Sequence, residues 1–277
     1  MTRGLELLTE LAVAFALCYV GKWMYAWIQR WPRLDHELTA RDNTAFAVPL
    51  GAYYLGLFLL LAGSGSGVAN VDYSLSAAVL TGLVGLSMLN IGMRLMDHLF
   101  FRGLNLHGRI LNGRSLPAGT LMGGSHLACA LVVWGALADR GGWLATLVFW
   151  LYGQAILMVA GRLFCTLGRY RLSTELRRGN LAVAISVAGS LIAIANIVRL
   201  SLNGPFDGWS SGLAASTGYA LAGVGILLII RKGVDWLLLP GVTIRHEIVR
   251  REVPNIGIGF LLAIFYVGLS ILVGWIL

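Results

Sequence analysis

The residues of this chain that could do chemistry are few, and most stand at the ends of long apolar segments. Three glutamates lie in arginine-rich stretches, each followed within eight residues by an asparagine: Glu37 with Asn43, Glu175 with Asn180 and Glu247 with Asn255. A carboxylate among arginines is typical of a solvated ion pair, and an Asn before an apolar run is typical of a helix N-cap. Two alternatives stay open, a docking face formed by the glutamates and arginines and a polar ring formed by the three asparagines with Ser115.

Two pairs of oppositely charged residues lie at the ends of other apolar segments. Arg94 and Asp97 are three residues apart, and Arg231 and Asp235 are four apart. On a helix these spacings put both charges on one face. The pairs predict either an ion pair at the membrane interface, with the long arginine side chains reaching toward water, or a gate or ion-binding site.

Deeper in the apolar segments stand Gln154, His126 and Asn90. Polar side chains at such depth usually face the interior of a helical bundle. They predict hydrogen bonds between helices or, as the alternative, the lining of a path for an ion or solute.

The motifs of enzymes are missing from the sequence. There is no HExxH, no GxSxG and no glycine-rich phosphate loop, and Cys18, Cys129 and Cys165 all fall in apolar segments as small apolar residues. We expect no catalytic residue, no cofactor and no metal, and therefore a protein that is not an enzyme.

The amino-acid composition indicates the class of protein in which these residues lie. Hydrophobic residues make up 57% and charged residues 12% of 277 residues, more apolar surface than one soluble core could bury. Eight segments are long enough to cross a bilayer as helices: 6–28, 44–63, 75–98, 116–137, 142–165, 181–202, 211–231 and 254–277. The sequence predicts an all-α polytopic membrane protein in a lipid bilayer.

Positive charge sorts by membrane side. Of 21 Lys and Arg residues, 18 lie in or beside the links that follow the odd-numbered segments. The positive-inside rule places those links in the cytoplasm and both termini outside. Trp23, Trp27 and Trp31, spaced four apart, predict an aromatic belt on that side. The net charge of +8 is explained by this sorting, so we expect no nucleic acid as a partner, whereas a cytoplasmic protein partner and a homo-oligomer stay open.

The segments repeat as hairpins. Four and eight residues after the anchors Asn43, Ser115, Asn180 and Asn255 stand small residues, respectively Ala47, Gly119, Ala184 and Gly259, and Gly51, Gly123, Ala188 and Ala263. Such rows allow close helix packing in membranes. Equivalent residues recur after about 138 positions, which predicts two four-helix halves, 1–138 and 139–277, inserted the same way up about an axis along the membrane normal.

The stretches ELTARDNTAFAVPLG, ELRRGNLAVAISVAG and HEIVRREVPNIGIG resemble the YjfL-like bacterial inner-membrane proteins, a family defined by a domain of unknown function (DUF350). Its members typically have four helices in two hairpins, and this chain resembles a doubled version. The second hairpin departs from the pattern, since HGRILNGRS lacks the glutamate. The resemblance implies a bacterial inner membrane and a link to envelope-stress or transport gene sets, without an established activity.

Two functions remain. The first is non-enzymatic passage of a small ion or solute along the axis between the hairpins, and the alternative is a membrane scaffold or envelope-stress component that docks a cytoplasmic partner through its basic loops. Passage predicts that Gln154, His126 and Asn90 converge on a cavity, whereas a seam of Ala, Gly and Leu along the axis would speak against it.

Overall fold

Eight long helices make up most of the molecule. The computed structural model describes residues 2–63, 75–137, 142–203, 208–238 and 243–276. Within these residues the long helices are α1 (Thr2–Ile28), α3 (Thr44–Gly63), α4 (Leu75–Leu95), α6 (Leu116–Ala136), α7 (Trp143–Leu167), α9 (Leu181–Leu202), α10 (Trp209–Leu238) and α11 (Ile256–Ile276). Each contains a stretch long and apolar enough to cross a membrane. The predicted all-α polytopic class with eight spans is confirmed.

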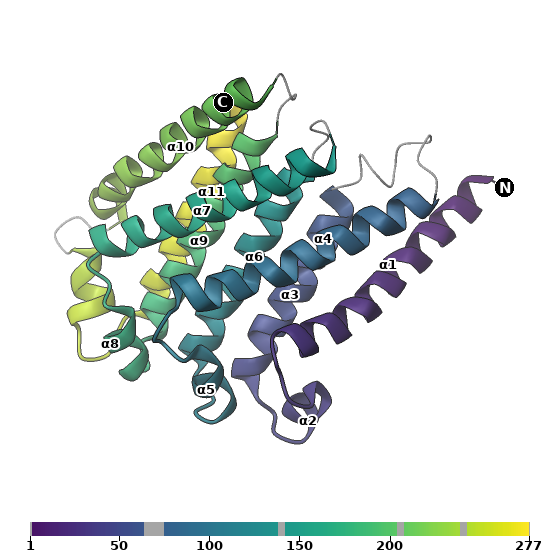
Figure 1. Cartoon of the computed structure of the whole chain (residues 1–277). Coiled ribbons are helices and arrows are strands. Elements are labelled where there is room, and N and C mark those ends of the chain that lie inside the picture. Colours follow the sequence, from purple (N-terminus) through teal and green to yellow (C-terminus); the bar gives the residue numbers. More distant parts are fainter. Residues whose placement is uncertain (1, 64–74, 138–141, 204–207, 239–242, 277) are drawn as a thin grey trace.

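Short helices fill the basic links, which the sequence predicted only as loops. They are α2 (Leu34–Thr39), α5 (Leu106–Leu111), α8 (Leu172–Arg177) and the π-helix η2 (His246–Arg250), while a second π-helix, η1 (Met96–Phe100), prolongs α4. In Figure 1, α2, α5 and α8 lie at the lower side of the molecule, which we call the loop side, and both chain ends lie at the opposite side. This arrangement agrees with an even number of membrane crossings.

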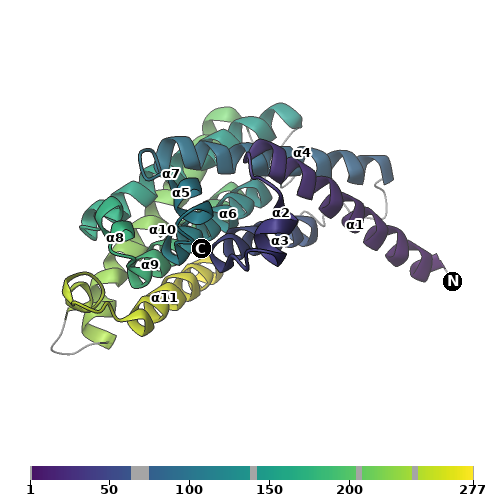
Figure 2. The same cartoon turned by 90° about the horizontal axis from the view of Figure 1, so that it is seen from below.

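The long helices form two layers. One layer contains α3, α6, α9 and α11 in that order, and the other contains α1, α4, α7 and α10 (Figures 1 and 2). The main packing runs along the first layer, from α3 to α6, from α6 to α9 and from α9 to α11. The hairpins therefore follow one another in a row with α3 and α11 at its ends. The expected arrangement of four hairpins about one axis is not confirmed, since the small-residue faces of the described helices pack side by side in sequence order.

Glycines and alanines set the distances within the first layer. A Cβ on Gly259 of α11 would lie 2.6 Å from the carbonyl oxygen of Ala182 in α9, and a Cβ on Gly119 of α6 would overlap the corresponding oxygen of Ala45 in α3. These helices touch through their backbones, as small residues allow in membranes. Gly51 departs from the predicted row, since it is exposed and nothing lies within 4 Å of its Cβ position.

The first helix of each predicted half ends in the same turn. Arg30 and Arg169 have positive φ angles of 55° and 54°, and the next residue donates its N–H to a carbonyl five positions back, from Trp31 to Ala26 and from Tyr170 to Cys165. These are the 6→1 bonds of a Schellman turn. The left-handed residue turns Trp31 inward to 6% exposure, so Trp31 does not join the predicted aromatic belt, while Trp23 and Trp27 stay exposed.

Candidate functional site

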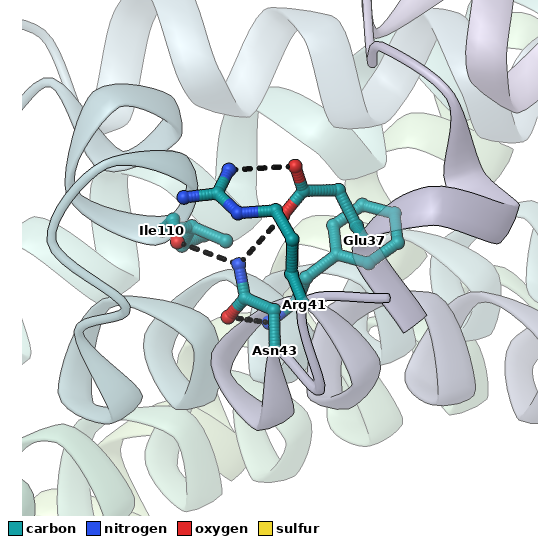
Figure 3. A network of polar contacts seen from close by, with 5 residues as sticks. Glu37, Arg41, Asn43 and Ile110 are labelled. Atoms are coloured by element: carbon teal, nitrogen blue, oxygen red, sulfur yellow. Dashed lines mark hydrogen bonds and ion pairs between the residues drawn. The ribbon is translucent and has the colours of Figure 1, made fainter. Parts of the chain in front are cut away.

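A buried asparagine fastens the link between α1 and α3 to the next hairpin (Figure 3). The amide of Asn43 donates to the Glu37 carboxylate over 2.9 Å and to the carbonyl oxygen of Ile110 in α5 over 3.0 Å. Its side-chain oxygen accepts the N–H of Phe46, which is N-capping. Arg41 donates to the other carboxylate oxygen of Glu37 over 2.8 Å. We call this arrangement of Glu, Asn and a carbonyl of the next link the loop latch.

The charge state of Glu37 follows from the latch. Burial alone would raise the pKa of the carboxyl, but the hydrogen bonds from Asn43 and Arg41 outweigh it and hold the pKa below the usual range. The carboxylate is therefore ionised, and both of its oxygens accept hydrogen bonds within the protein. The predicted solvated ion pair is instead a buried one.

The second predicted half repeats the latch. The amide of Asn180 donates to Glu175 over 2.6 Å and to the carbonyl oxygen of Ile248 over 2.7 Å, and its side-chain oxygen accepts the N–H of Val183. Asn43 and Asn180 are 137 positions apart, and Ile110 and Ile248 are 138 apart. These contacts are the ones that duplication predicts, while superposition of the two halves 1–138 and 139–277 stays a prediction.

The other two links have weaker versions. Asn255 caps Ile258 and donates to Glu247 over 3.5 Å, and Glu247 is also bound by Arg251 over 2.7 Å. Ser115 makes no side-chain capping bond, and α6 begins instead with a proline in its first turn. Capping is thus observed at all three asparagines. Asn43 and Asn180 are each occupied by their own latch, so they do not form the suggested ring.

The predicted ion pair between Arg94 and Asp97 is absent from the salt bridges of the described residues. Asp97 lies in η1, which begins two residues after Arg94. One carboxylate oxygen of Asp97 is buried and finds no hydrogen-bond partner in the described part of the chain. Arg231 and Asp235 lie on α10, but their side chains fall outside the described part.

A recess opens beside Asp97 on the loop side. It has a volume of about 290 Å³ and is bordered by Arg94, Asp97, His98, Arg102, Asn105 and His107 among others. His107 stacks on Trp31 with ring centroids 4.4 Å apart. Burial, together with the charge of Arg94, lowers the pKa of His107 to about 4. His107 is therefore neutral at neutral pH.

Polar side chains continue from the recess into the bundle. Gln29 donates to the backbone carbonyl of Asn90 over 3.3 Å, and the Asn90 amide donates to the hydroxyl of Tyr53 over 3.3 Å. Tyr53 in turn donates to the carbonyl oxygen of Gly21 over 3.0 Å. The side-chain oxygens of Gln29 and Asn90 are buried, and no described residue donates a hydrogen bond to them. Asn90 stands ten residues before the end of η1, about 15 Å into the span at 1.5 Å per residue.

The rings of Tyr25 and Tyr53 connect these polar side chains to His126. Tyr25 stacks on Tyr53 with centroids 4.5 Å apart and meets His126 edge-on at 5.7 Å. His126 Nδ1 lies 3.0 Å from the carbonyl oxygen of Pro49, which makes Nδ1 the protonated nitrogen. The hydroxyl of Tyr25 and His126 Nε2 are buried without hydrogen-bond partners within the described ranges. We call Tyr25, Gln29, Tyr53, Asn90 and His126 the buried polar line.

Gln154 lies beside this line rather than in it. Its side-chain oxygen accepts from the thiol of Cys129 at 3.8 Å, and its amide nitrogen lies against Gly92, where a Cβ would be only 2.8 Å away. Cys129 is three residues from His126 and Gly92 is two from Asn90. The structure thus brings Gln154 of the second half against the first half, beside the regions of His126 and Asn90.

Sequence reasoning missed Tyr25, Gln29 and Tyr53. The signal at Gln29 was its place directly after α1 and before Arg30. The tryptophans around it suggested only an interfacial belt. Tyr25 and Tyr53 looked like any other aromatic residue in an apolar run. Only the packing of α1 against α3 and α4 shows that their hydroxyls face inward.

The fold and these contacts define a class: a multi-pass membrane protein built from helical hairpins whose basic links fold against one another. The chain belongs to the family of the Domain of Unknown Function (DUF350), whose model matches residues 1–137 and again 140–277. The family expected from the sequence, in doubled form, is confirmed.

A curated relative and the solved structures complete the comparison. The UPF0719 transmembrane protein YshE of Bacillus subtilis (strain 168) is 31% identical over 104 residues, which cover 38% of this chain and 71% of the relative. No solved structure matches the chain. The relative's name describes a transmembrane protein and states no activity.

Proposed function

We propose that the protein, in the bacterial inner membrane with both termini outside, binds a small cation from the loop side and passes it through its first half without enzymatic chemistry. The observation that carries this proposal is the set of unpaired buried oxygens on Tyr25, Gln29, Asn90 and Asp97. A polar atom buried without a partner costs on the order of 1–3 kcal/mol. A hydrated cation would satisfy such oxygens, which supports a polar path rather than a purely structural network.

The unpaired groups favour a cation over an anion. Four of them offer oxygen, the ligand that small hard cations prefer, and Asp97 carries a carboxylate. Arg94 and Arg102 border the same recess and would repel a cation at its entrance. The Asp97 carboxylate is therefore the group that has to offset them.

The path proposed here differs from the axis expected between four hairpins. Along the first layer the helices touch through glycine and alanine backbones, which supports no path there. The buried polar line instead lies between α1, α3, α4 and α6. Beyond Asn90, toward the far side, the buried neighbours are Leu57, Leu60 and Leu86. Passage would thus require these apolar ends to separate, as in a carrier that alternates between two openings.

Flux through liposomes tests the proposal. Purified protein should move at least one of H⁺, Na⁺ and K⁺, and Asp97→Asn, which keeps the shape but removes the charge, should lower that flux about tenfold, equivalent to ~1.4 kcal/mol. Asp42→Asn is the matched control, since Asp42 is exposed with a left-handed φ of 45° that Asn tolerates. Chloride flux alone, no flux, or equal effects of both variants would rule out the cation path.

The alternative is a scaffold that docks a cytoplasmic protein. It is favoured by α8, because the loop latch holds Glu175 while Arg171 and Arg177 stay exposed. A fixed frame with exposed arginines suits an acidic partner. Loss of a specific pull-down in Arg171→Glu with Arg177→Glu, in a protein without cation flux, would favour this function.

A further inference from the structure

A second, larger cleft opens on the loop side of the other half. It has a volume of about 950 Å³ and lies among the ends of α7 and α10, η2 and α11. Arg169, Arg245 and Arg250 border it together with Tyr170 and Tyr266. In Figure 2 the loop-side ends of α10 and α11 lie together at one end of the molecule.

The cleft corresponds to the recess beside Asp97, with its chemistry changed. Thr243, Ile244 and Arg245 border it 138 positions after Asn105, Leu106 and His107 of the recess. Where neutral His107 stacks on Trp31, the second half has a guanidinium at Arg245 and a phenol at Tyr170. The replacement puts a positive charge where the first half has a neutral ring.

The carboxylate that shares η2 with Arg250 is already bound to other residues. Glu247, on the same short helix, is bound by Arg251 over 2.7 Å and by Asn255 over 3.5 Å. Arg245 Nε is buried and has no hydrogen-bond partner among the described residues. A buried guanidinium N–H without an acceptor is costly unless an acceptor arrives. An oxygen-rich anion supplies one, and guanidinium matches phosphate in geometry.

The other wall of the cleft is apolar and open to lipid. Leu167, Leu228 and Ile229 border it, and Ile229 is 72% exposed on the outer surface of α10. A volume of about 950 Å³ exceeds what an inorganic phosphate fills and lies at the upper end of ligand pockets. Basic residues at the membrane surface beside apolar side chains match a phospholipid, with its headgroup at the arginines and its acyl chain along the helix.

We propose that this cleft binds the phosphate headgroup of an anionic phospholipid, with Arg245 and Arg250 as its main ligands and an acyl chain packed along Leu228 and Ile229. The site is independent of the cation path, because it lies in the other half and shares no residue with the buried polar line.

Native mass spectrometry of the whole chain tests the site. The protein in detergent is titrated with phosphatidylglycerol, with phosphatidylcholine of the same acyl chains, and with inorganic phosphate. We expect phosphatidylglycerol to be retained over phosphatidylcholine, and Arg245→Gln with Arg250→Gln to weaken its retention about tenfold. Arg245→Lys, which keeps the charge but loses the planar fork, should weaken it less.

Matched controls decide between a site and general attraction. Arg114 and Arg177 are exposed arginines of the loop side that do not border the cleft. Arg114→Gln with Arg177→Gln should leave retention unchanged at an equal thermal midpoint. An equal loss in both double variants would overturn the proposal, as would retention of inorganic phosphate without a preference for the anionic lipid, which would assign the cleft to a soluble ligand.

Discussion

The side-chain amide of Asn180 lies 2.7 Å from the carbonyl oxygen of Ile248, two residues that are 68 positions apart. The same contact recurs between Asn43 and Ile110 over 3.0 Å. In both cases an asparagine that caps one helix also holds the link of the next hairpin. The basic links are thus part of the packed structure, and their glutamates are internal ligands of the amides.

Removing the latch asparagine should destabilise the protein. Asn180→Ala leaves the Ile248 carbonyl, the Glu175 carboxylate and the Val183 N–H without this partner, and we expect a loss on the order of 2–3 kcal/mol. Thermal or denaturant unfolding in detergent measures it. Asn43→Ala should cost a similar amount. Asn255→Ala should cost less than half as much, because its bond to Glu247 is 3.5 Å long, and an equal cost would contradict the role of the latch.

The contact between α3 and α6 should not tolerate a side chain at Gly119. Gly119→Ala places a methyl group against the Ala45 backbone, which cannot rotate away as a side chain does, and we expect a loss of about 3 kcal/mol or failure to fold. Gly51→Ala is the control, since its Cβ position is open. It should be neutral or stabilising by about 0.5–1 kcal/mol. Yield of monodisperse protein and the thermal midpoint report both, and equal behaviour would refute the close packing.

Stability should fall as pH drops through the range set by His107. Its pKa in the folded protein is about 4, below the ~6.5 of an unfolded chain. Between these values the unfolded state binds more protons, so stability present at pH 7 declines toward pH 4. The pKa of Glu37 is lowered in the folded protein. Its contribution to stability is therefore lost only as the pH falls below the usual pKa range of a glutamate.

Substitution of His107 isolates that contribution. His107→Phe retains a ring against Trp31 but does not titrate, so its thermal midpoint should change less between pH 7 and pH 4.5. His98→Gln is the control, because His98 borders the same recess and is exposed. A wild-type slope in His107→Phe would show that another group carries the dependence.

The side of the membrane that the basic links face is open to direct test. A reporter active only in the cytoplasm should give signal when inserted between Gly113 and Arg114, in the exposed link before α6, or within 167–179. It should give none when fused to Leu277. Signal from the C-terminal fusion and none from the links would reverse the orientation that the 18 loop-side positive charges predict.

Local properties determined much of this protein from sequence alone. The eight spans follow from runs of about 20 apolar residues, and the caps at Asn43, Asn180 and Asn255 follow from their position before such runs. Small residues at regular steps showed which helix faces approach closely. Each of these features depends on neighbours within a few positions of the chain, so each is readable without the fold.

Only the tertiary structure decided where the hairpins and the polar side chains meet. The small-residue faces are equally compatible with a ring and a row, and the row follows from α6 packing on both α3 and α9. One left-handed residue, Arg30, turned Trp31 from the membrane surface to His107. Among the described residues, Arg94 and Asp97 do not form the ion pair that their spacing suggested. Tyr25, Gln29 and Tyr53 gained their place in the buried polar line from distant contacts, such as that of Gln29 with Asn90, 61 positions away, and that of Tyr25 with His126. No local pattern encodes such contacts, because they depend on how separate helices pack.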